Sequence, residues 1–205
     1  MKLGKWYGNV FARIYDPFMH TLEEKIFAHK RQHFLHSLSG RVLDVGSGTG
    51  ANFPHFSNSA LVTAVEPNHK MMEFAKAKLP FKAEINLVLG GIGAPSLSFP
   101  ENHFDFIVST LVLCTIPNPE QALELFKKWL KPGGKLILIE HIRSHNHLTG
   151  LAQDLVNPAW KLVADGCNLN RNTDKMVREA GFIVENENYF HVGFRWFEGV
   201  YVISK

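Results

Sequence analysis

The spacing of apolar residues along this chain changes from a helical period to a strand period. Over residues 1–40 apolar side chains recur every three or four positions, as Leu22 and Ile26 do, which predicts helix. The basic residues Lys25, Lys30 and Arg31 fall on the opposite side of this helix and are predicted to face solvent. The N-terminal fifth of the chain is therefore predicted to be helical.

After this segment, short β-rich runs alternate with helical stretches. Strands are predicted over residues 41–45, 61–66, 85–89, 104–109 and 135–141. A helical stretch is expected between each of these strands and the next. Such alternation is typical of a parallel sheet with helices on both faces. The glycines after Pro132 are predicted to end the last of these helices and turn the chain into the fifth strand.

The last third of the chain has a different pattern. After Gly150 comes a helical segment that Pro158 is predicted to interrupt, followed by a short helix near 172–180. Two β-like runs, near 182–190 and 198–204, have too few residues between them for a crossover helix, so they are predicted to pair antiparallel. The predicted fold class is α/β: a Rossmann-like, seven-stranded, mostly parallel sheet with a C-terminal antiparallel hairpin and helices on both faces.

The first predicted strand runs into the glycine-rich segment RVLDVGSGTG, in which Asp44 ends the strand. Three glycines follow with one residue between each pair: Gly46, Gly48 and Gly50. The second predicted strand ends in Glu66. Strand, glycine turn, helix and a second strand with a terminal acid is the arrangement by which a parallel sheet holds an adenosine, whose ribose hydroxyls the acid accepts. The pattern predicts a site for a nucleoside cofactor.

The acid at the end of the first strand bears on which cofactor is bound. GSGTGA also satisfies the dinucleotide fingerprint G-x-G-x-x-A, so the glycines alone are compatible with NAD(P). The carboxylate of Asp44 would repel a pyrophosphate, whereas it would attract the methionine ammonium of S-adenosyl-L-methionine (SAM). A buried acid without a nearby cation would also be costly. The alternative is that Asp44 only caps the turn. We expect SAM, with S-adenosyl-L-homocysteine as the product.

Length, charge and cysteine content exclude several classes of protein. The 205 residues suffice for one domain with a three-layer core, and 45% hydrophobic content is ordinary for a globular protein. A formal net charge of +3 is too small to favour nucleic acid. The two cysteines, Cys114 and Cys167, form no metal-like pair and favour a reducing compartment. Without a signal-peptide pattern or a membrane-length apolar run, a cytoplasmic location is predicted.

Four segments occur in the order and at the spacing of a known family. VLDVGSGTGANF, VEPN, FDFIVSTLVLC and LKPGGKLILIEHI resemble the class I SAM-dependent methyltransferases, and the resemblance covers roughly residues 41–182. TLVLCTIPNP and PAWKLVADGCNLNR are similar to the methyltransferase-like group that includes alkyl-thiol S-methyltransferases. Ubiquinone/menaquinone C-methyltransferases and bacterial phospholipid N-methyltransferases share the core motifs. The resemblance implies the class I methyltransferase fold and methyl transfer from SAM to a small lipophilic acceptor, with a thiol favoured.

The resemblance also implies which residues hold the cofactor. The cofactor loop and ribose contact correspond to Asp44, Gly46, Ser47, Gly48, Thr49, Gly50 and Glu66. Pro67 and Asn68 correspond to residues that border the adenine. Many relatives place an acid after the third strand for the adenine amino group, but this chain reads VLGGIGAP, so Gly91 and Ile92 are expected to offer backbone groups and an apolar wall. Tyr15 corresponds to an N-terminal lid over the cofactor.

Chain position adds candidates at the ends of the fourth and fifth strands. Ligands of such sheets bind at the carboxyl ends of strands, so Thr110 and Leu111 are expected to meet the methionine part of SAM, unless they only pack the core. His141 ends the fifth strand and is a candidate general base, with a neutral, backbone-bonded histidine as the alternative. Asp165 is a candidate for orienting a substrate or His141, unless it only caps a helix.

Three histidines lie close together in sequence at the end of the fifth strand. They are His141, His145 and His147. They fall on a strand end and a predicted loop, without a carboxylate at a recognisable metal-binding spacing. No metal site is therefore predicted, and each histidine is expected to be solvated or hydrogen-bonded singly.

We expect one SAM-dependent methyltransferase domain over residues 1–205. It would comprise a helical lid (1–40), a cofactor-binding core (41–142) and a substrate-side insertion with the C-terminal hairpin (143–205). Many aromatic residues in the first and last of these parts favour a lipophilic small-molecule acceptor. Phospholipid N-methylation and quinol-type C-methylation stay open as alternatives. An NAD(P)-dependent oxidoreductase and a non-catalytic SAM-binding module are the alternatives from other classes.

Macromolecular partners are only weakly indicated. The fourth strand ends in STLVLC and not in the N/D-P-P-Y/F turn that stacks a flipped base, so no nucleic-acid partner is expected. Within residues 1–20, the apolar residues Trp6, Val10, Ile14 and Phe18 fall four apart beside basic ones. This pattern is compatible with peripheral membrane contact and equally with a lid helix that packs on its own protein. The sequence predicts no oligomeric state.

Overall fold

The computed structural model of the protein describes residues 5–203, except for the side chains of residues 5–7 and 18. Its centre is a seven-stranded sheet with the order β3-β2-β1-β4-β5-β7-β6. The strands are β1 (Gly40–Val45), β2 (Ala60–Glu66), β3 (Glu84–Leu89), β4 (Phe104–Thr110), β5 (Leu130–Ile142), β6 (Phe182–Val192) and β7 (Phe194–Ile203). Strands β1 to β5 pair in parallel, whereas β7 is antiparallel to both β5 and β6. The predicted sheet and its C-terminal hairpin are confirmed.

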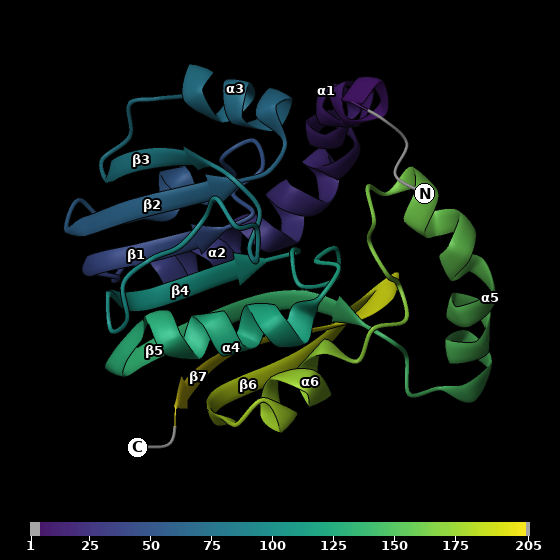
Figure 1. Cartoon of the computed structure of the whole chain (residues 1–205). Helices are drawn as coiled ribbons and strands as arrows, with labels where there is room; N and C mark the ends of the chain where they lie inside the picture. Colours follow the sequence, from purple (N-terminus) through teal and green to yellow (C-terminus); the bar gives the residue numbers. More distant parts are fainter. Residues whose placement is uncertain (1–4, 204–205) are drawn as a thin grey trace.

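Helices cover both faces of this sheet, with α4 and α6 on one face and α2 on the other (Figure 1). The helical elements are α1 (Lys5–Leu22), the π-helix η1 (Glu23–Phe27), α2 (Ala28–Leu35), the 3₁₀-helix η2 (Phe53–His55), α3 (His69–Ala77), α4 (Pro119–Trp129), α5 (His147–Val163) and α6 (Thr173–Glu179). The expectation of a helix between each pair of successive strands is wrong twice. Only η2 separates β1 from β2, and the glycine- and proline-rich segment 90–103 contains turns and no helix.

Asparagine side chains fix where three of these helices begin. Asn68 accepts hydrogen bonds from backbone N–H groups in the first turn of α3, Asn118 does the same for α4, and Asn146 for α5. Pro119 follows Asn118 at the start of α4, where its missing N–H costs no helical hydrogen bond. Each cap satisfies backbone donors that a helix start otherwise leaves free.

The C-terminal third departs from the expectation in two details. Helix α5 begins before Gly150 and continues through Pro158, which was expected to interrupt it. A single proline removes one helical hydrogen bond, and α5 tolerates that loss. Strand β5 begins at Leu130, so Pro132 and the two glycines after it lie inside β5. A register shift between Phe104 and the next paired residue of β4 accommodates this irregular start.

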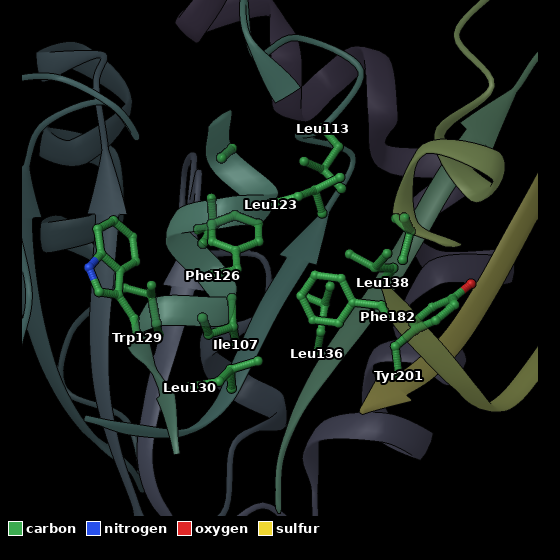
Figure 2. Close-up of a cluster of buried hydrophobic side chains, with 14 of the residues drawn as sticks. Ile107, Leu113, Leu123, Phe126, Trp129, Leu130, Leu136, Leu138, Phe182 and Tyr201 are labelled. Carbon is green, nitrogen blue, oxygen red and sulfur yellow. The ribbon is translucent and has the colours of Figure 1, made fainter. Parts of the chain in front are cut away.

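The apolar core has two parts, one on each face of the sheet. The part under α4 and α6 is shown in Figure 2. Its labelled side chains are Ile107, Leu113, Leu123, Phe126, Trp129, Leu130, Leu136, Leu138, Phe182 and Tyr201. In the other part, Phe27, Phe34 and Leu35 of η1 and α2 pack against the sheet. Trp196 of β7 belongs to this part of the core as well.

Arg31 does not face solvent as predicted. Its side chain is buried with 4% exposure, whereas Lys25 is exposed as expected. The π-helical turn η1 lies between α1 and α2, and a π-turn holds one residue more than an α-turn. The residues after this turn keep the α-helical phase, and Arg31 lies four residues after Phe27 and four before Leu35, so it shares the buried face with them.

The carboxyl ends of the parallel strands lie beside α1 and α5. In Figure 1 the arrowheads of β1, β4 and β5 point toward these two helices. Helix α5 exposes apolar side chains, with Leu148 at 77% and Leu155 at 83% exposure. Among the helices of the described residues, none has the length and apolar character needed to cross a membrane.

Candidate functional site

The glycine-rich turn after β1 requires glycine for two reasons. Gly46, Gly48 and Gly50 have φ values of 60°, 57° and 84°, which L side chains rarely adopt. A Cβ on Gly46 would lie 2.6 Å from Val112, and one on Gly50 would lie 2.7 Å from the Phe53 ring. A Cβ on Gly48 would meet no atom closer than 3.9 Å. The turn is therefore packed at its two ends and open at its centre, where a ligand can approach the backbone.

The side chain of Asp44 lies near this turn, and only one of its two carboxylate oxygens has a hydrogen-bond partner in the part of the chain that the structure describes. The residue has 0% exposure. Its Oδ1 accepts a hydrogen bond of 2.6 Å from Asn52 Nδ2, and its Oδ2 has no hydrogen-bond partner among residues 5–203. Burial raises the pKa of Asp44 to about 7, although Asn52 and the more distant Arg31 act to lower it. A cationic ligand group is attracted to such a carboxylate.

A chain of polar side chains connects this carboxylate to the N-terminal helices. The guanidinium of Arg31 donates to Asn52 Oδ1 and, at 2.7 Å, to Glu23 Oε1. Asn52 therefore accepts a hydrogen bond from Arg31 through its side-chain oxygen and donates one to Asp44 through its side-chain nitrogen. This chain supplies a protein cation near the buried acid, from a residue that was predicted to face solvent.

Glu66 closes the turn from the end of β2. Its two carboxylate oxygens accept backbone hydrogen bonds from Gly48 at 2.9 Å and from Asn68 at 2.8 Å. Burial raises the pKa of Glu66 to about 7 against these two bonds, and the carboxylate of Asp165 adds to the increase. Because each carboxylate oxygen accepts more than one hydrogen bond, Glu66 retains capacity for ligand hydroxyls.

Helix α1 is attached to the glycine turn through Asp16. Thr49 Oγ1 donates to Asp16 Oδ1 at 2.6 Å, and Lys78 Nζ donates to Asp16 Oδ2 at 2.9 Å. The neighbouring Tyr15 has a pKa raised above its ordinary value by burial, with Arg31 opposing this effect. The structure therefore places Tyr15 near the same end of the sheet as the turn. Ser47, also in the turn, is buried.

The residues expected around an adenine lie beside Glu66. A Cβ on Gly91 would lie 3.7 Å from Cβ of Pro67, so the loops after β2 and β3 are adjacent. Ile92 packs on the core cluster beneath these loops. Asn68 uses its side-chain oxygen to cap α3 and donates from Nδ2 to the Gly8 carbonyl of α1 at 3.2 Å.

The loop after β4 packs against the glycine turn. Thr110 is buried, and its Oγ1 lies 3.4 Å from Asn52 Nδ2. Leu111 has a φ of 61°, an unusual conformation for a leucine, and its N–H donates to Ile139 in β5. Backbone strain of this kind costs free energy and persists only where surrounding structure enforces it. The loop beyond Leu111 therefore depends on contacts from other elements.

Glu140 and Arg171 supply those contacts. Glu140 Oε1 accepts the N–H groups of Val112 and Leu113, both at 2.7 Å, while its Oε2 has no partner among the described residues. Burial raises the pKa of Glu140 to about 7, whereas His141 and the two N–H groups lower it. Arg171 Nη1 donates to the carbonyl oxygens of Leu113 and Ile116. The loop is thus held from both sides.

At the same end of the sheet, His141 meets two cysteines. His141 Nε2 lies 3.0 Å from Cys167 Sγ. One ligand-type atom from each of Cys114, His141 and Cys167 lies within 4.8 Å of the other two. Cys114 and His141 are buried, and Cys167 is partly buried. These residues come from the loop after β4, from β5 and from the loop between α5 and α6.

The close packing of this cluster shifts all three pKa values. A hydrogen bond from the Cys114 thiol lowers the pKa of Cys167 against the effect of burial, and His141 lowers it further. The same hydrogen bond, together with burial, raises the pKa of Cys114. Burial lowers the pKa of His141, but Cys167 and Glu140 outweigh burial and raise it above its ordinary value.

The remaining sequence candidates near the end of β5 and after α5 are exposed residues. His145 and His147 are exposed, in contrast to His141. Asp165 is exposed and has a φ of 47°. His141 has Cys167 beside Nε2 and no hydrogen-bond partner at Nδ1 within the described structure, so no hydrogen bond from Asp165 orients it.

Sequence reasoning missed four residues of this site. Arg31 was assigned to solvent, and Asn52 carried no recognisable signal within the sequence after the glycine turn. Glu140 follows apolar residues of a buried strand, and an acid at that place is a signal that a ligand or backbone partner is near. Cys167 lies 26 residues after His141, so their contact follows only from the folded structure.

Comparisons with known proteins agree with this fold and site. Residues 43–138 match the family described as "Methyltransferase domain". Thiol S-methyltransferase TMT1B of Rattus norvegicus is 30% identical over 80% of this chain and 69% of its own length. TMT1B of Mus musculus is 30% identical over 95% of this chain and 81% of its own length.

A solved structure confirms the architecture. A chain from the complex between the Haloferax volcanii Trm112 methyltransferase activator and a methyltransferase superposes with a TM-score of 0.71, over 97% of this chain and 98% of that chain. At 14% identity this likeness concerns the fold alone. Fold, site and relatives define an enzyme that uses SAM as methyl donor. The chain belongs to the class I SAM-dependent methyltransferases, in the same family as the TMT1B enzymes. The oxidoreductase alternative therefore does not hold.

Proposed function

We propose that this methyltransferase acts on the sulfur of a small lipophilic thiol. The observation that carries the proposal is the match to TMT1B enzymes, which are named thiol S-methyltransferases and align with 80% to 95% of this chain. The structure supports an apolar acceptor, because aromatic rings surround the cluster at the end of β5. Trp196 lies 5.5 Å from His141 between ring centroids, and Phe194 lies 6.2 Å from both His141 and Trp160.

The residues at the ends of β1 and β2 fit SAM. The free carboxylate oxygen of Asp44 is buried and suits the methionine ammonium. The open side of Gly48 allows a ligand to approach the backbone, and Glu66 retains lone pairs for two ribose hydroxyls. We infer that these three residues form the centre of the cofactor site.

Further residues would complete this cofactor site. They are Gly46, Ser47, Thr49 and Gly50 of the turn, Pro67, Asn68, Gly91 and Ile92 beside the adenine, Thr110 and Leu111 beside the methionine part, and Tyr15 from α1. The hydrogen bond between Thr49 and Asp16 supports the lid role of α1, because it ties the helix to the turn at 2.6 Å.

When bound, SAM supplies a methyl group that is already activated on a sulfonium. The enzyme's contribution is then to align the acceptor sulfur with that methyl group and to exclude water. In our proposal the loop after β4, held by Glu140 and Arg171, sets the position of the methyl end relative to His141. His141 as proton acceptor and Asp165 as a substrate contact remain predictions.

A methyl-transfer screen with radiolabelled SAM tests the acceptor. The purified protein is incubated with alkyl thiols, quinols, amines and phospholipids under identical conditions, and each product is quantified. We expect label in the methyl thioether of a lipophilic thiol and much less with a short hydrophilic thiol as the matched control. Predominant labelling of a quinol or a phospholipid would instead establish one of the two alternative acceptors and reject the thiol.

Two further expectations concern location. Of the apolar row in residues 1–20, Ile14 is 53% exposed and Val10 is partly buried, whereas the side chains of Trp6 and Phe18 lie outside the described part of the chain. Peripheral membrane contact through this segment is tested by vesicle flotation of the full chain and of an Ile14→Asp variant. The cytoplasmic location stays a prediction.

A further inference from the structure

We propose that Cys114, His141 and Cys167 form a binding site for one zinc ion, and that this ion binds the acceptor thiol as a thiolate. The second half of the proposal rests on the proposed thiol substrate, whereas the metal site itself does not. The juxtaposition that carries it is the approach of two thiol sulfurs and an imidazole nitrogen to within 4.8 Å of one another.

The donor set matches the chemistry of zinc. Zinc is bound by cysteine sulfur at about 2.3 Å and by histidine nitrogen at about 2.0 Å, so atoms grouped as closely as these are within reach of one ion. Soft thiolate ligands with imidazole select zinc over magnesium or calcium, which prefer oxygen. Three protein ligands with a free fourth position are typical of catalytic zinc sites, whereas structural sites use four.

The three ligands are positioned by contacts that do not involve a metal. The backbone N–H and the side chain of Asn168 both donate to the Cys114 carbonyl oxygen, at 3.0 and 2.9 Å. This double contact links the loop of Cys114 directly to the loop of Cys167. Glu140 and Arg171 hold the same loop from the strand and from the segment before α6. Such outer contacts are what orient metal ligands in proteins.

Two buried polar atoms at this site lack a partner. Buried polar atoms in native proteins nearly always have one, yet His141 Nδ1 and Glu140 Oε2 have none among the described residues. The cluster also places two ionisable thiols in an apolar, aromatic environment, where an uncompensated charge is costly. A zinc ion with two thiolates and a neutral imidazole forms a neutral unit, which removes that cost.

The free position of the ion lies where the acceptor sulfur must react. The cluster is at the carboxyl ends of β4 and β5, next to the loop that begins at Leu111, and beside the apolar rings of Phe194 and Trp196. An acceptor R–SH that occupies the fourth position loses its proton to solvent and not to His141, which is then bound to the ion, because zinc strongly favours the thiolate form of its ligands.

The transfer step then balances without a further reactant. The acceptor sulfur forms a bond to the methyl carbon, and the bond between that carbon and the sulfonium sulfur breaks. The electron pair of the broken bond stays on the departing sulfur, which becomes a neutral thioether. The methylated acceptor is also a neutral thioether and a much poorer zinc ligand than a thiolate, so it leaves the ion.

Metal content tests the site directly. Full-length protein without an affinity tag is stripped with a chelator, re-equilibrated with zinc, desalted and measured by elemental mass spectrometry, and we expect about one zinc per chain. Replacement by Co²⁺ should give thiolate-to-cobalt absorption bands. Protein that retains no zinc, or that instead shows a Cys114–Cys167 disulfide under the same reducing conditions, would overturn the site.

Variants separate the ligands from their surroundings. Cys114→Ser, Cys167→Ser and His141→Ala should each weaken zinc binding by on the order of 100-fold or more. His145→Ala is the matched control, because His145 is exposed and lies outside the cluster, and its zinc content should equal that of wild type. SAM binding by calorimetry checks that each variant is folded. Equal zinc content in all four variants would place the metal elsewhere and reject the assignment.

Activity measurements then distinguish this proposal from the proposed function. If zinc activates the acceptor, the apo enzyme should bind SAM with unchanged affinity, lose at least 10-fold in thiol methylation, and regain activity on addition of zinc. Equal activity of apo and zinc-loaded enzyme would reject the activating role. Zinc bound by the three ligands in an enzyme that methylates only non-thiol acceptors would reject the thiol proposal and leave the metal site standing.

Discussion

The candidate site lies along the carboxyl ends of the parallel strands and has two parts, a cofactor end at β1 and β2 and an acceptor end at β4 and β5. The two ends hold their buried polar groups in different ways. At the ends of β1 and β2 the groups are carboxylates: one oxygen of Asp44 accepts from the Asn52 amide, and the two oxygens of Glu66 accept the backbone N–H groups of Gly48 and Asn68. At the ends of β4 and β5, sulfur and imidazole accompany the carboxylate of Glu140, and loops from distant parts of the chain hold these groups together. The first end suits a cation and hydroxyl groups, whereas the second suits a soft metal or a thiol.

This difference implies that the two ends can be damaged separately. Cofactor binding should depend on the first end, and acceptor chemistry on the second. The two are joined at Asn52, which contacts both Asp44 and Thr110, and at the packing of Val112 against Gly46. Substitutions at either end, away from these two contacts, test whether cofactor binding and methyl transfer can be impaired separately.

Removal of Arg31 should have the largest effect on stability. Arg31→Ala takes the cation from a buried chain that reaches Asp44 through Asn52, and we expect the free energy of unfolding to fall by about 3–5 kcal/mol. Lys25→Ala, an exposed residue of the same helical segment, is the control and should change it by less than about 0.5 kcal/mol. Urea denaturation measures both, and similar values for the two variants would contradict the buried role of Arg31.

Loss of Glu140 should affect the acceptor end more than the cofactor end. Glu140→Ala leaves the N–H groups of Val112 and Leu113 without their acceptor, so we expect a loss of about 2–3 kcal/mol in stability. Methyl transfer should fall far more than SAM affinity does. Glu140→Gln keeps an acceptor oxygen and should lose less. Calorimetry of SAM binding beside single-turnover rates decides the point, and equal losses of binding and transfer would show that the two ends are not separable.

Glu66 is the corresponding test at the cofactor end. Glu66→Ala removes the proposed ribose contact and the acceptor for Gly48 and Asn68, so SAM affinity should weaken by about 1–3 kcal/mol. Glu66→Gln retains an acceptor oxygen and should bind more tightly than the alanine variant. Calorimetry gives both affinities, and SAM affinity unchanged in Glu66→Ala would remove this residue from the cofactor site.

The raised pKa values of Asp44 and Glu66 predict a specific pH dependence. Both carboxyls have folded-state pKa values of about 7, above ordinary values of 3.8 and 4.5, so the folded protein binds more protons between roughly pH 4 and 7. These two carboxyls should therefore lower the stability of the SAM-free protein as pH rises through this window, by roughly 2 kcal/mol each between pH 5 and 7.5. Asp44→Asn removes one titrating group and should flatten the slope. An identical slope in wild type and variant, measured by urea denaturation at each pH, would refute the assignment.

The contact between α1 and the glycine turn should contribute least. Asp16→Ala breaks a partly buried hydrogen bond from Thr49 and an exposed one from Lys78, and we expect SAM affinity to weaken by less than about 1 kcal/mol. Faster amide hydrogen exchange in α1 should accompany it. Glu73→Ala, which removes a surface ion pair to Lys70 away from the turn, is the control. Unchanged exchange in Asp16→Ala would show that this contact does not hold the helix.

Much of the fold followed from the sequence. The five parallel strands and the C-terminal hairpin were predicted, because the apolar periods and the turn residues that define them are local properties of the chain. The prediction that Arg31 faces solvent was wrong because its charge was taken to mark the exposed face, although it lies four residues from both Phe27 and Leu35 on the buried face. The prediction of a helix between β3 and β4 was wrong because alternation of strands and helices was assumed in a segment where glycine and proline favour turns.

The sequence by itself determined the glycine turn with an acid at the end of each flanking strand, and hence the SAM-dependent class. Positive φ angles and close backbone approach require glycine at fixed spacing, so one short segment of sequence is enough to predict the cofactor turn. Only the tertiary structure decided that Cys114, His141 and Cys167 meet, and that Arg31 stands behind Asp44. Those contacts join residues from separate elements, and their geometry depends on sheet order and loop packing, which no local spacing encodes.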